Sequence, residues 1–180
     1  HGAGNDFVVI DARAVDARWD DVARRMCDRH FGVGSDGLIL ICDSRRADLR
    51  MCMFNPDGSE AEACGNGLRC FVKYAVDQGL VGSTDFDVET QGGIRHAKAF
   101  RNEGNGVSEA EVGMGVPRFT PQDIPARVAA ADHGAIIQVE LTLPDRTIPV
   151  SLVSMGNPHA VAFLSEDVSG FPLESVGPAV

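Results

Sequence analysis

The chain has 180 residues, 44% of them hydrophobic, which is enough to bury one ordinary core or two small ones. Its formal net charge of −10 would repel a phosphate backbone, and no basic patch is interleaved with aromatic residues, so nucleic acid is excluded as an expected partner. The unbroken apolar stretches fall far short of the roughly 20 residues that cross a bilayer. We therefore expect no membrane span, and the residues after His1 show no secretory signal.

The cysteines are odd in number and are scattered through a chain of ordinary composition. A disulfide-stapled secreted domain has a different pattern, so we expect reduced thiols and a cytoplasmic protein. The cysteines are Cys27, Cys42, Cys52, Cys64 and Cys70.

Two segments have the spacing of amphipathic helices. From Asp16 to His30, acidic residues come early and arginines late, which suits the helix dipole, and Gly32 ends the run. A second helix is expected after Cys64 and ends at Gly79. Its apolar positions are Leu68, Phe71, Val72, Ala75 and Val76.

Much of the remaining chain alternates between apolar and polar residues, as half-buried strands do. The alternation is clearest at residues 49–53 and 137–143. Turn residues separate the runs: residues 55–58 predict a turn, and Gly92-Gly93 and Pro144-Asp145 predict hairpins. The pattern indicates a strand-rich protein with two helices.

Three prolines, Pro117, Pro121 and Pro125, indicate a connection between two units. We place the boundary between residues 1–116 and 117–180. The second stretch holds a hairpin, the loop "SMGNPHAV" and a tail rich in proline and glycine, which is thin for an independent core. We expect it to be the incomplete start of a second unit.

Cys64 comes directly before Gly65-Asn66-Gly67 and the second helix, in the stretch "EACGNGLRCF". The first turn of a helix has unpaired backbone N–H groups and a partial positive charge, which stabilise a thiolate more than a thiol. The glycines let a ligand approach, so these N–H groups could hold a carboxylate while Cys64 faces the adjacent carbon. A buried loop thiol beside a glycine turn is an equal alternative at this point. The other four cysteines are expected to pack as small hydrophobes.

No cofactor and no metal are expected. The chain has no C-x-x-C or H-x-x-x-H pair, and a structural zinc needs four converging ligands. Pyridoxal phosphate needs a Schiff-base lysine, and neither Lys73 nor Lys98 lies in a suggestive loop. The stretch "HGAGNDF" lacks the spacing of a phosphate-binding loop and predicts a turn before a strand at residues 7–10. His159, taken alone, is expected to be structural.

Taken together and in order, "HGAGNDF", "FGVGSDGLILI", "FNPDGSEAEACGNGLRC" and "SMGNPHAV" resemble the motifs of the diaminopimelate epimerases. The resemblance spans nearly the whole chain, and four motifs in register are far more specific than any one of them. It favours a functional role for Cys64. It implies a cofactor-independent isomerase that interconverts LL- and meso-diaminopimelate in lysine and peptidoglycan-precursor biosynthesis.

In this family, two cysteines on opposite faces of the substrate carbon move its proton, one as a thiolate base and the other as a thiol acid. Cys64 resembles the first of the two. The resemblance also implies that His159 adjusts the protonation of the cysteine. The substrate-binding residues that it implies are the amides of Asn5, Asn55 and Asn157 and the backbone donors of Gly65 and Asn66.

The chain departs from the family pattern in two places. The family's second cysteine lies in another C-G-[SN]-G-type loop preceded by a Glu-Arg pair, and no cysteine follows Cys70 here. We therefore expect residues 1–180 alone to be inactive. Gly37 stands where some members carry a substrate-contacting glutamine, so that contact could come only from the backbone.

The resemblance implies an α+β fold in which a mixed, mainly antiparallel sheet curls around a central helix. Residues 1–116 would form one complete half with the first catalytic cysteine, and residues 117–180 the start of a second similar half. The expected partner is a small-molecule amino acid, and a homodimer is left open. Two other functions stay open: a proline racemase-like or related amino-acid isomerase, and a non-catalytic amino-acid-binding protein.

Overall fold

The computed structural model describes residues 1–61, 64–125, 134–144, 146–165 and 167–179. The chain divides into two compact units, His1–Met114 and Gly115–Val180. The division falls in the segment that leads to the three prolines. No helix among the described residues is long and apolar enough to span a membrane.

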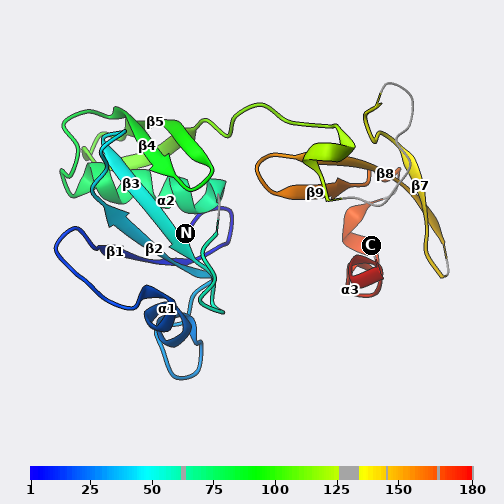
Figure 1. Ribbon diagram of the computed structural model, residues 1–180, viewed down its shortest axis with the longest axis horizontal. Helices are drawn as coiled ribbons and strands as arrows, with labels where there is room; N and C mark the ends of the chain where they lie inside the picture. Colours follow the sequence, from blue (N-terminus) through cyan, green and yellow to red (C-terminus); the bar gives the residue numbers. More distant parts are fainter. Residues whose placement is uncertain (62–63, 126–133, 145, 166, 180) are drawn as a thin grey trace. The chain divides into compact units, whose positions relative to one another are not determined.

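The first unit is built on one six-stranded sheet with the strands in chain order (Figure 1). The pairs β1/β2 and β3/β4 are parallel, whereas β2/β3, β4/β5 and β5/β6 are antiparallel. This confirms the mixed, mainly antiparallel sheet that the resemblance implied. The strands are β1 (Phe7–Asp11), β2 (Gly37–Cys42), β3 (Leu49–Phe54), β4 (Asp85–Thr90), β5 (Gly93–Arg101) and β6 (Val107–Val112).

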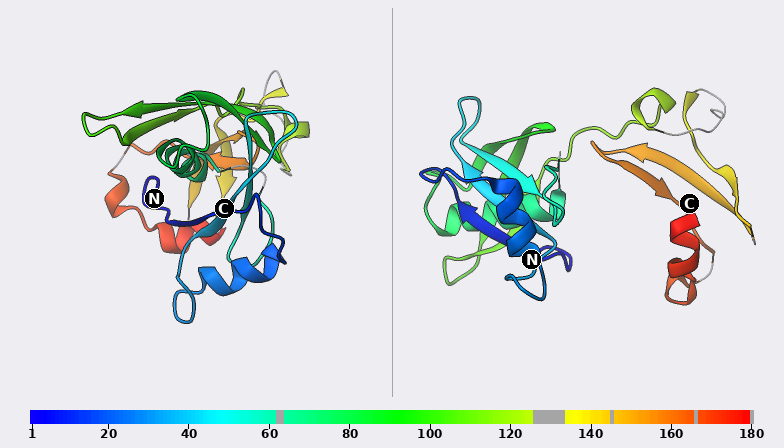
Figure 2. Two further views of the ribbon diagram at one scale, coloured as in Figure 1. Left: turned by 90° about the vertical axis from the view of Figure 1, so that its left-hand side faces the viewer. Right: turned by 60° about the horizontal axis from the view of Figure 1, so that its bottom comes forward.

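The sheet curls around helix α2 (Gly65–Asp77), which contacts strands from both ends of the sheet, including β1 and β6. Figure 2 shows α2 nearly end-on beneath the green strands in its left view. Phe71, Val72 and Ala75 of α2 are fully buried in the core between the helix and the sheet. The apolar spacing after Cys64 therefore predicted the helix correctly, because its buried face is the centre of the unit.

Helix α1 (Trp19–Cys27) covers the opposite face of the sheet and contacts β2. Strand β2 is consequently buried on both faces: Ile39 and Ile41 pack in the cluster with α2, whereas Leu38 and Leu40 pack in the cluster with α1. A strand covered on both sides has no polar face. This explains why its sequence is an unbroken apolar run rather than an alternation.

Helix α1 is shorter than the predicted Asp16–His30. It ends at Cys27 because the Asp28 carboxylate accepts backbone N–H bonds from His30 and Phe31, at 2.7 and 2.9 Å, and bends the chain into a turn. The chain then folds back against the helix so closely that a Cβ on Gly32 would lie 2.1 Å from the Arg25 carbonyl oxygen. Glycine is required there.

The turns of the first unit follow the predicted signals. Gly58 donates its N–H to the Asn55 carbonyl oxygen at 2.9 Å and has a φ of +83°. Gly93 opens β5 with a φ of +108° and pairs with Thr90, which closes the β4–β5 hairpin. The hairpin predicted at Pro144-Asp145 connects two observed strands, but Asp145 lies outside the described residues.

The second unit has a three-stranded antiparallel sheet in the order β7-β8-β9. Its buried apolar cluster is small and joins the sheet to a short helix through Ile148, Val150 and Val176. The elements are η1 (Pro121–Asp123), β7 (Val139–Thr142), β8 (Thr147–Ser154), β9 (Pro158–Val161), η3 (Val168–Gly170), α3 (Leu173–Val176) and η4 (Gly177–Ala179).

Strand β7 begins later than the alternation at 137–143 predicted. Gln138 has a φ of +51°, which ends an extended run, and the Ile137 side chain before it is 53% exposed. Only the part from Val139 pairs with β8. The prediction was wrong for Ile137 because apolar character alone does not reveal a backbone kink.

Candidate active site

Cys64 is the N-cap residue of α2. Its backbone is extended, with φ −143° and ψ 106°, and its Sγ accepts a hydrogen bond from the Gly67 backbone N–H at 3.3 Å. The side chain is half-buried and packs against the core cluster of α2. The sulfur therefore lies at the positive end of the helix, where first-turn N–H groups lack intrahelical partners.

A tight turn at the start of the chain lies against the N-terminus of α2. Gly2 and Asn5 exchange backbone hydrogen bonds of 2.9 and 3.0 Å around Ala3 and Gly4, which have φ values of 49° and 95°. A Cβ on Gly2 would lie 2.8 Å from the Asn66 carbonyl oxygen, so only glycine allows this approach. Gly2 therefore serves packing against α2, whereas Gly4 serves the turn itself, because its φ is positive and no neighbour lies within 4 Å of its Cβ position.

Asn5 and Asn66 are joined directly. The Asn66 amide nitrogen donates to the Asn5 amide oxygen at 2.8 Å. On its other side, Asn66 accepts a hydrogen bond from Arg69, one turn along the helix. The structure thus brings together four of the predicted site positions, Asn5, Cys64, Gly65 and Asn66, at the start of α2.

Sequence reasoning missed the ionic group that supports Asn5. The Asn5 amide nitrogen donates to Asp36 at 3.1 Å, and Arg29 donates to both Asp36 and Asp6 at 2.7 Å. Hydrogen bonds from Arg29 lower the pKa of Asp6 to about 2, and hydrogen bonds from Asn5 and the Asp6 backbone hold the pKa of Asp36 below its ordinary value. All three groups are therefore charged at neutral pH. The only indication of this group in the sequence was that Asp36 lies inside the motif "FGVGSDGLILI".

Asn55 lies in the turn after β3, before the cysteine loop. Its described hydrogen bonds stay within that turn: the side-chain amide donates to the Ser59 hydroxyl at 3.0 Å, and its backbone N–H donates to the Ser59 carbonyl at 2.8 Å. The structure therefore orders Asn55 without joining it to Asn5 or Cys64 by any described contact.

Two glycines of the predicted site are confined by neighbours. A Cβ on Gly65 would lie 3.2 Å from the Met114 sulfur. Gly37 is buried at the start of β2, where a Cβ would lie 3.0 Å from the Phe54 carbonyl oxygen and 3.4 Å from the Phe7 ring. A glutamine at position 37 would require its neighbours to shift.

Asn157 and His159 belong to the second unit, in the β8–β9 hairpin. The His159 Nε2 atom lies 3.0 Å from the Asn157 amide oxygen, and both side chains are exposed. The turn between the strands has Gly156 at a φ of +103°. These two predicted residues are therefore close to each other, and they lie in a different unit from Cys64.

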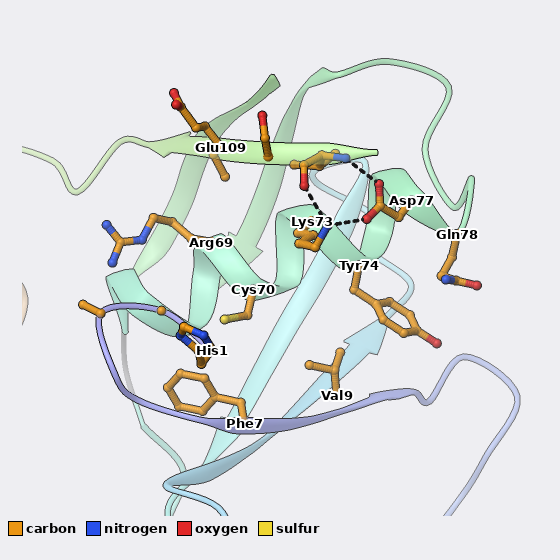
Figure 3. A pocket seen from close by; sticks show the side chains of 15 residues that line it. His1, Phe7, Val9, Arg69, Cys70, Lys73, Tyr74, Asp77, Gln78 and Glu109 are labelled. Atoms are coloured by element: carbon orange, nitrogen blue, oxygen red, sulfur yellow. Dashed lines mark hydrogen bonds and ion pairs between the residues drawn. The ribbon is translucent and has the colours of Figure 1, made fainter. Parts of the chain in front are cut away.

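A cavity of about 690 Å³ lies beside α2, between β1 and β6 (Figure 3). The Cys70 sulfur points toward it, and the Lys73 ammonium, which also lines it, donates to Asp77 at 2.8 Å and to the Val107 carbonyl at 2.6 Å. Neither Cys64 nor Asn5 lines this cavity. It is therefore distinct from the candidate site at the helix N-terminus.

Cys42 and Cys52 form a pair that sequence reasoning treated as packing. They come from neighbouring strands, and their sulfur atoms are 4.0 Å apart. Hydrogen bonding from the Cys42 thiol lowers the pKa of Cys52 to about 7, and the same contact raises the pKa of Cys42. Cys52 is thus a second candidate thiolate in the first unit. All five cysteines are free.

The described residues contain no group of three or more His, Cys, Asp or Glu side chains that could hold a metal ion. The chemistry that the candidate site can supply comes from a thiol, backbone N–H groups and amides. These are groups that move a proton and bind a carboxylate.

The fold defines a class of proteins. A hydroxyproline epimerase from Agrobacterium vitis superposes with a TM-score of 0.61 at 18% identity, covering 90% of this chain and 49% of that one. A probable proline racemase from Agrobacterium radiobacter K84 superposes with a TM-score of 0.59 at 20% identity, covering 82% of this chain and 41% of that one. The chain has the fold of these epimerase and racemase structures.

The sequence comparisons define the family within that class. The family model described as Diaminopimelate epimerase matches residues 1–120. The diaminopimelate epimerases of Agathobacter rectalis and Moorella thermoacetica are 46% and 43% identical, over 99% and 100% of this chain. The chain belongs to the diaminopimelate epimerase family, which confirms the resemblance seen in the four motifs. It spans 64% and 63% of the lengths of these two relatives.

Proposed function

We propose that this chain is the part of a cofactor-independent diaminopimelate epimerase that carries the thiolate base. The observation that carries the proposal is the position of Cys64 as the N-cap of α2, with Asn5 and Asn66 hydrogen-bonded beside it. The same chemistry assigns the substrate class, an amino acid whose carboxylate adjoins the carbon that is inverted. Family membership supports the diaminopimelate substrate.

The proposed reaction begins with the Cys64 thiolate, which takes the hydrogen of the substrate's α-carbon as a proton. The electron pair of the broken C–H bond spreads into the adjacent carboxylate, whose negative charge rises. Backbone N–H groups at the start of α2 then bind that carboxylate more strongly than in the ground state, which lowers the barrier. A thiol on the opposite face returns a proton to the carbon and inverts it.

Residues 71–180 contain no cysteine, so they do not supply the second thiol. By family resemblance it belongs to the other half of the complete enzyme. We propose accordingly that residues 117–180 begin that second half and that Asn157 and His159 serve the same site, with His159 adjusting cysteine protonation. Asn55 is proposed as a further substrate amide. The proposed setting is the cytoplasm, where thiols stay reduced.

The test uses the complete natural polypeptide with LL-diaminopimelate in deuterium oxide. The expected product is meso-diaminopimelate with deuterium at the inverted carbon, formed without added pyridoxal phosphate and in the presence of a chelator. Cys64→Ala should lower the rate by at least about 10² to 10⁴, the contribution of a positioned acid or base. Cys70→Ala is the matched control and should keep the activity. Full activity of Cys64→Ala would refute the proposal.

A further inference from the structure

We infer that Asp36 is a positioning residue that sets which way the Asn5 amide faces, and that Asn5 consequently meets the ligand as a hydrogen-bond donor. This inference rests on the proposed function, because it takes the start of α2 as the substrate site. It concerns Asp36, which accepts a hydrogen bond from the Asn5 amide, and Arg29, which donates to Asp36.

The orientation of the Asn5 amide follows from the groups on its two sides. An ionised carboxylate only accepts hydrogen bonds, so the amide nitrogen of Asn5 faces Asp36, at 3.1 Å. The amide oxygen then faces the Asn66 amide nitrogen, at 2.8 Å. A reversed Asn5 amide would place oxygen against the carboxylate and nitrogen against nitrogen. The charge of Asp36 therefore excludes the reversed orientation.

Asp36 is itself fixed on several sides. Arg29 donates to its Oδ1 at 2.7 Å, and the Asp6 backbone N–H donates to its Oδ2 at 3.2 Å. The Asp36 backbone N–H in turn donates to the Asp6 carbonyl oxygen at 2.8 Å. Arg29 also binds the Asp6 carboxylate with two hydrogen bonds, of 2.7 and 3.1 Å. The carboxylate that orients Asn5 is thus held by two segments of the chain.

The network continues into the helix that carries Cys64. Asn66 is the second residue of α2, and its amide oxygen accepts from Arg69 while its amide nitrogen donates to Asn5. Donors and acceptors therefore alternate without conflict from Arg29 through Asp36, Asn5 and Asn66 to Arg69. This alternation fixes both amides at the edge of the candidate site.

The amide of Asn5 has one group left for a ligand. Its oxygen is engaged by Asn66, and one of its two N–H groups is engaged by Asp36. The remaining N–H is a donor, which suits a carboxylate oxygen of an amino acid rather than its ammonium group. Asn5 is therefore assigned to an acceptor atom of the substrate.

The Asp36→Asn variant distinguishes two roles of Asp36: orienting the Asn5 amide, and merely linking the segments that carry Asn5 and Asp36. If the new amide offers its oxygen to Arg29, its nitrogen faces Asn5 and favours the reversed Asn5 amide, although the shape hardly changes. In the complete enzyme, we expect KM for LL-diaminopimelate to rise about tenfold in both Asp36→Asn and Asp36→Ala, as for loss of a hydrogen bond that involves a charged group. Asp11→Ala is the matched control, because it removes the Asp11–Arg13 ion pair of 2.7 Å outside the network. It should leave KM unchanged.

The decisive measurement is a double-mutant cycle with Asn5→Ala. If Asp36 acts through Asn5, Asp36→Asn changes KM less than twofold in the Asn5→Ala background. An equal change in both backgrounds would overturn the inference, as would an Asp36→Asn enzyme with the KM of the parent.

A second readout needs no substrate. The side-chain amide signals of Asn5 in NMR should report a rigid group in the parent and a mobile one in Asp36→Ala, with Asp11→Ala like the parent. If the parent lacks epimerase activity, the proposed function fails, and the NMR result still decides the positioning role. A mobile Asn5 amide in the parent would overturn that role.

Discussion

The Cys64 sulfur accepts the Gly67 backbone N–H at 3.3 Å, so the candidate base is also the cap of the helix that would bind the substrate carboxylate. The proposed thiolate base and the cap of the helix are thus the same residue. A substitution at Cys64 acts on both, and the two effects can be separated.

Cys64→Ser should keep the stability of the chain, whereas Cys64→Ala should lower it. A serine hydroxyl accepts the same N–H, but alanine leaves it without its cap, at a cost of about 1 kcal/mol in the free energy of unfolding. Urea unfolding of both variants measures the difference. Both variants should be inactive as bases in the complete enzyme. Equal stability of the two would show that the cap contributes nothing.

Alkylation near neutral pH should label Cys64 and Cys52 before the other three thiols. The Cys42 thiol lowers the pKa of Cys52 to about 7, so Cys42→Ala should return it toward about 8.5 and slow labelling of Cys52 about tenfold at pH 7. Labelling of Cys64 should not change. Peptide mapping after limiting iodoacetamide measures both rates, with Cys70→Ala as the control. Preferential labelling of Cys27 or Cys70 in the folded chain would contradict the prediction.

The ion pair of Asp6 and Arg29 should make stability depend on pH only in acid. The pKa of Asp6 is lowered from 3.8 to about 2, so its contribution is complete above about pH 4 to 5 and is lost as the pH falls toward 2. The difference in unfolding free energy between the parent and Asp6→Asn should therefore be constant from pH 5 to 7 and shrink below pH 4. A difference that grows on acidification has the wrong sign for this assignment.

His159→Asn should change the pH profile of Cys64 alkylation between about pH 6 and 9, if His159 adjusts the protonation of the cysteine. The structure shows His159 hydrogen-bonded to Asn157 in the second unit, so this role is still a prediction. His96→Asn is the control, because His96 lies between Asp85 and Asp87 in the first unit. Identical profiles for the parent and His159→Asn would return His159 to a structural role.

Residues 1–180 alone should not epimerise diaminopimelate, because one cysteine serves one face of the carbon. The residues after Cys70 contain no second thiol, and loss of a catalytic acid costs about 10² to 10⁴ in rate. Loss of the protein surface that would exclude water from the site lowers the rate further. A coupled assay or chiral chromatography should show no meso product. Clear epimerisation by this chain would mean that the two-cysteine mechanism does not apply to it.

The sequence alone was enough to predict the elements that depend only on residues close together in the chain, namely helix α2 and the turns. The apolar spacing after Cys64 predicted α2, since a helix that buries one face repeats every three to four residues. Turn residues at 55–58 and Gly92-Gly93 predicted the turns, because glycine adopts the required positive φ. The position of Cys64 at the helix start followed from the same spacing.

Only the tertiary structure decided which distant residues share the site. Asn5 meets Asn66 across 61 residues of sequence, and it meets Asp36 across 31. No periodicity reports such a pairing, because it depends on how the sheet curls around α2 and brings its loops to one end of the helix. The same holds for the sulfur pair of Cys42 and Cys52, which arises from the register of β2 and β3. Sequence specifies the chemistry that each segment can offer, whereas packing selects the partners with which that chemistry is used.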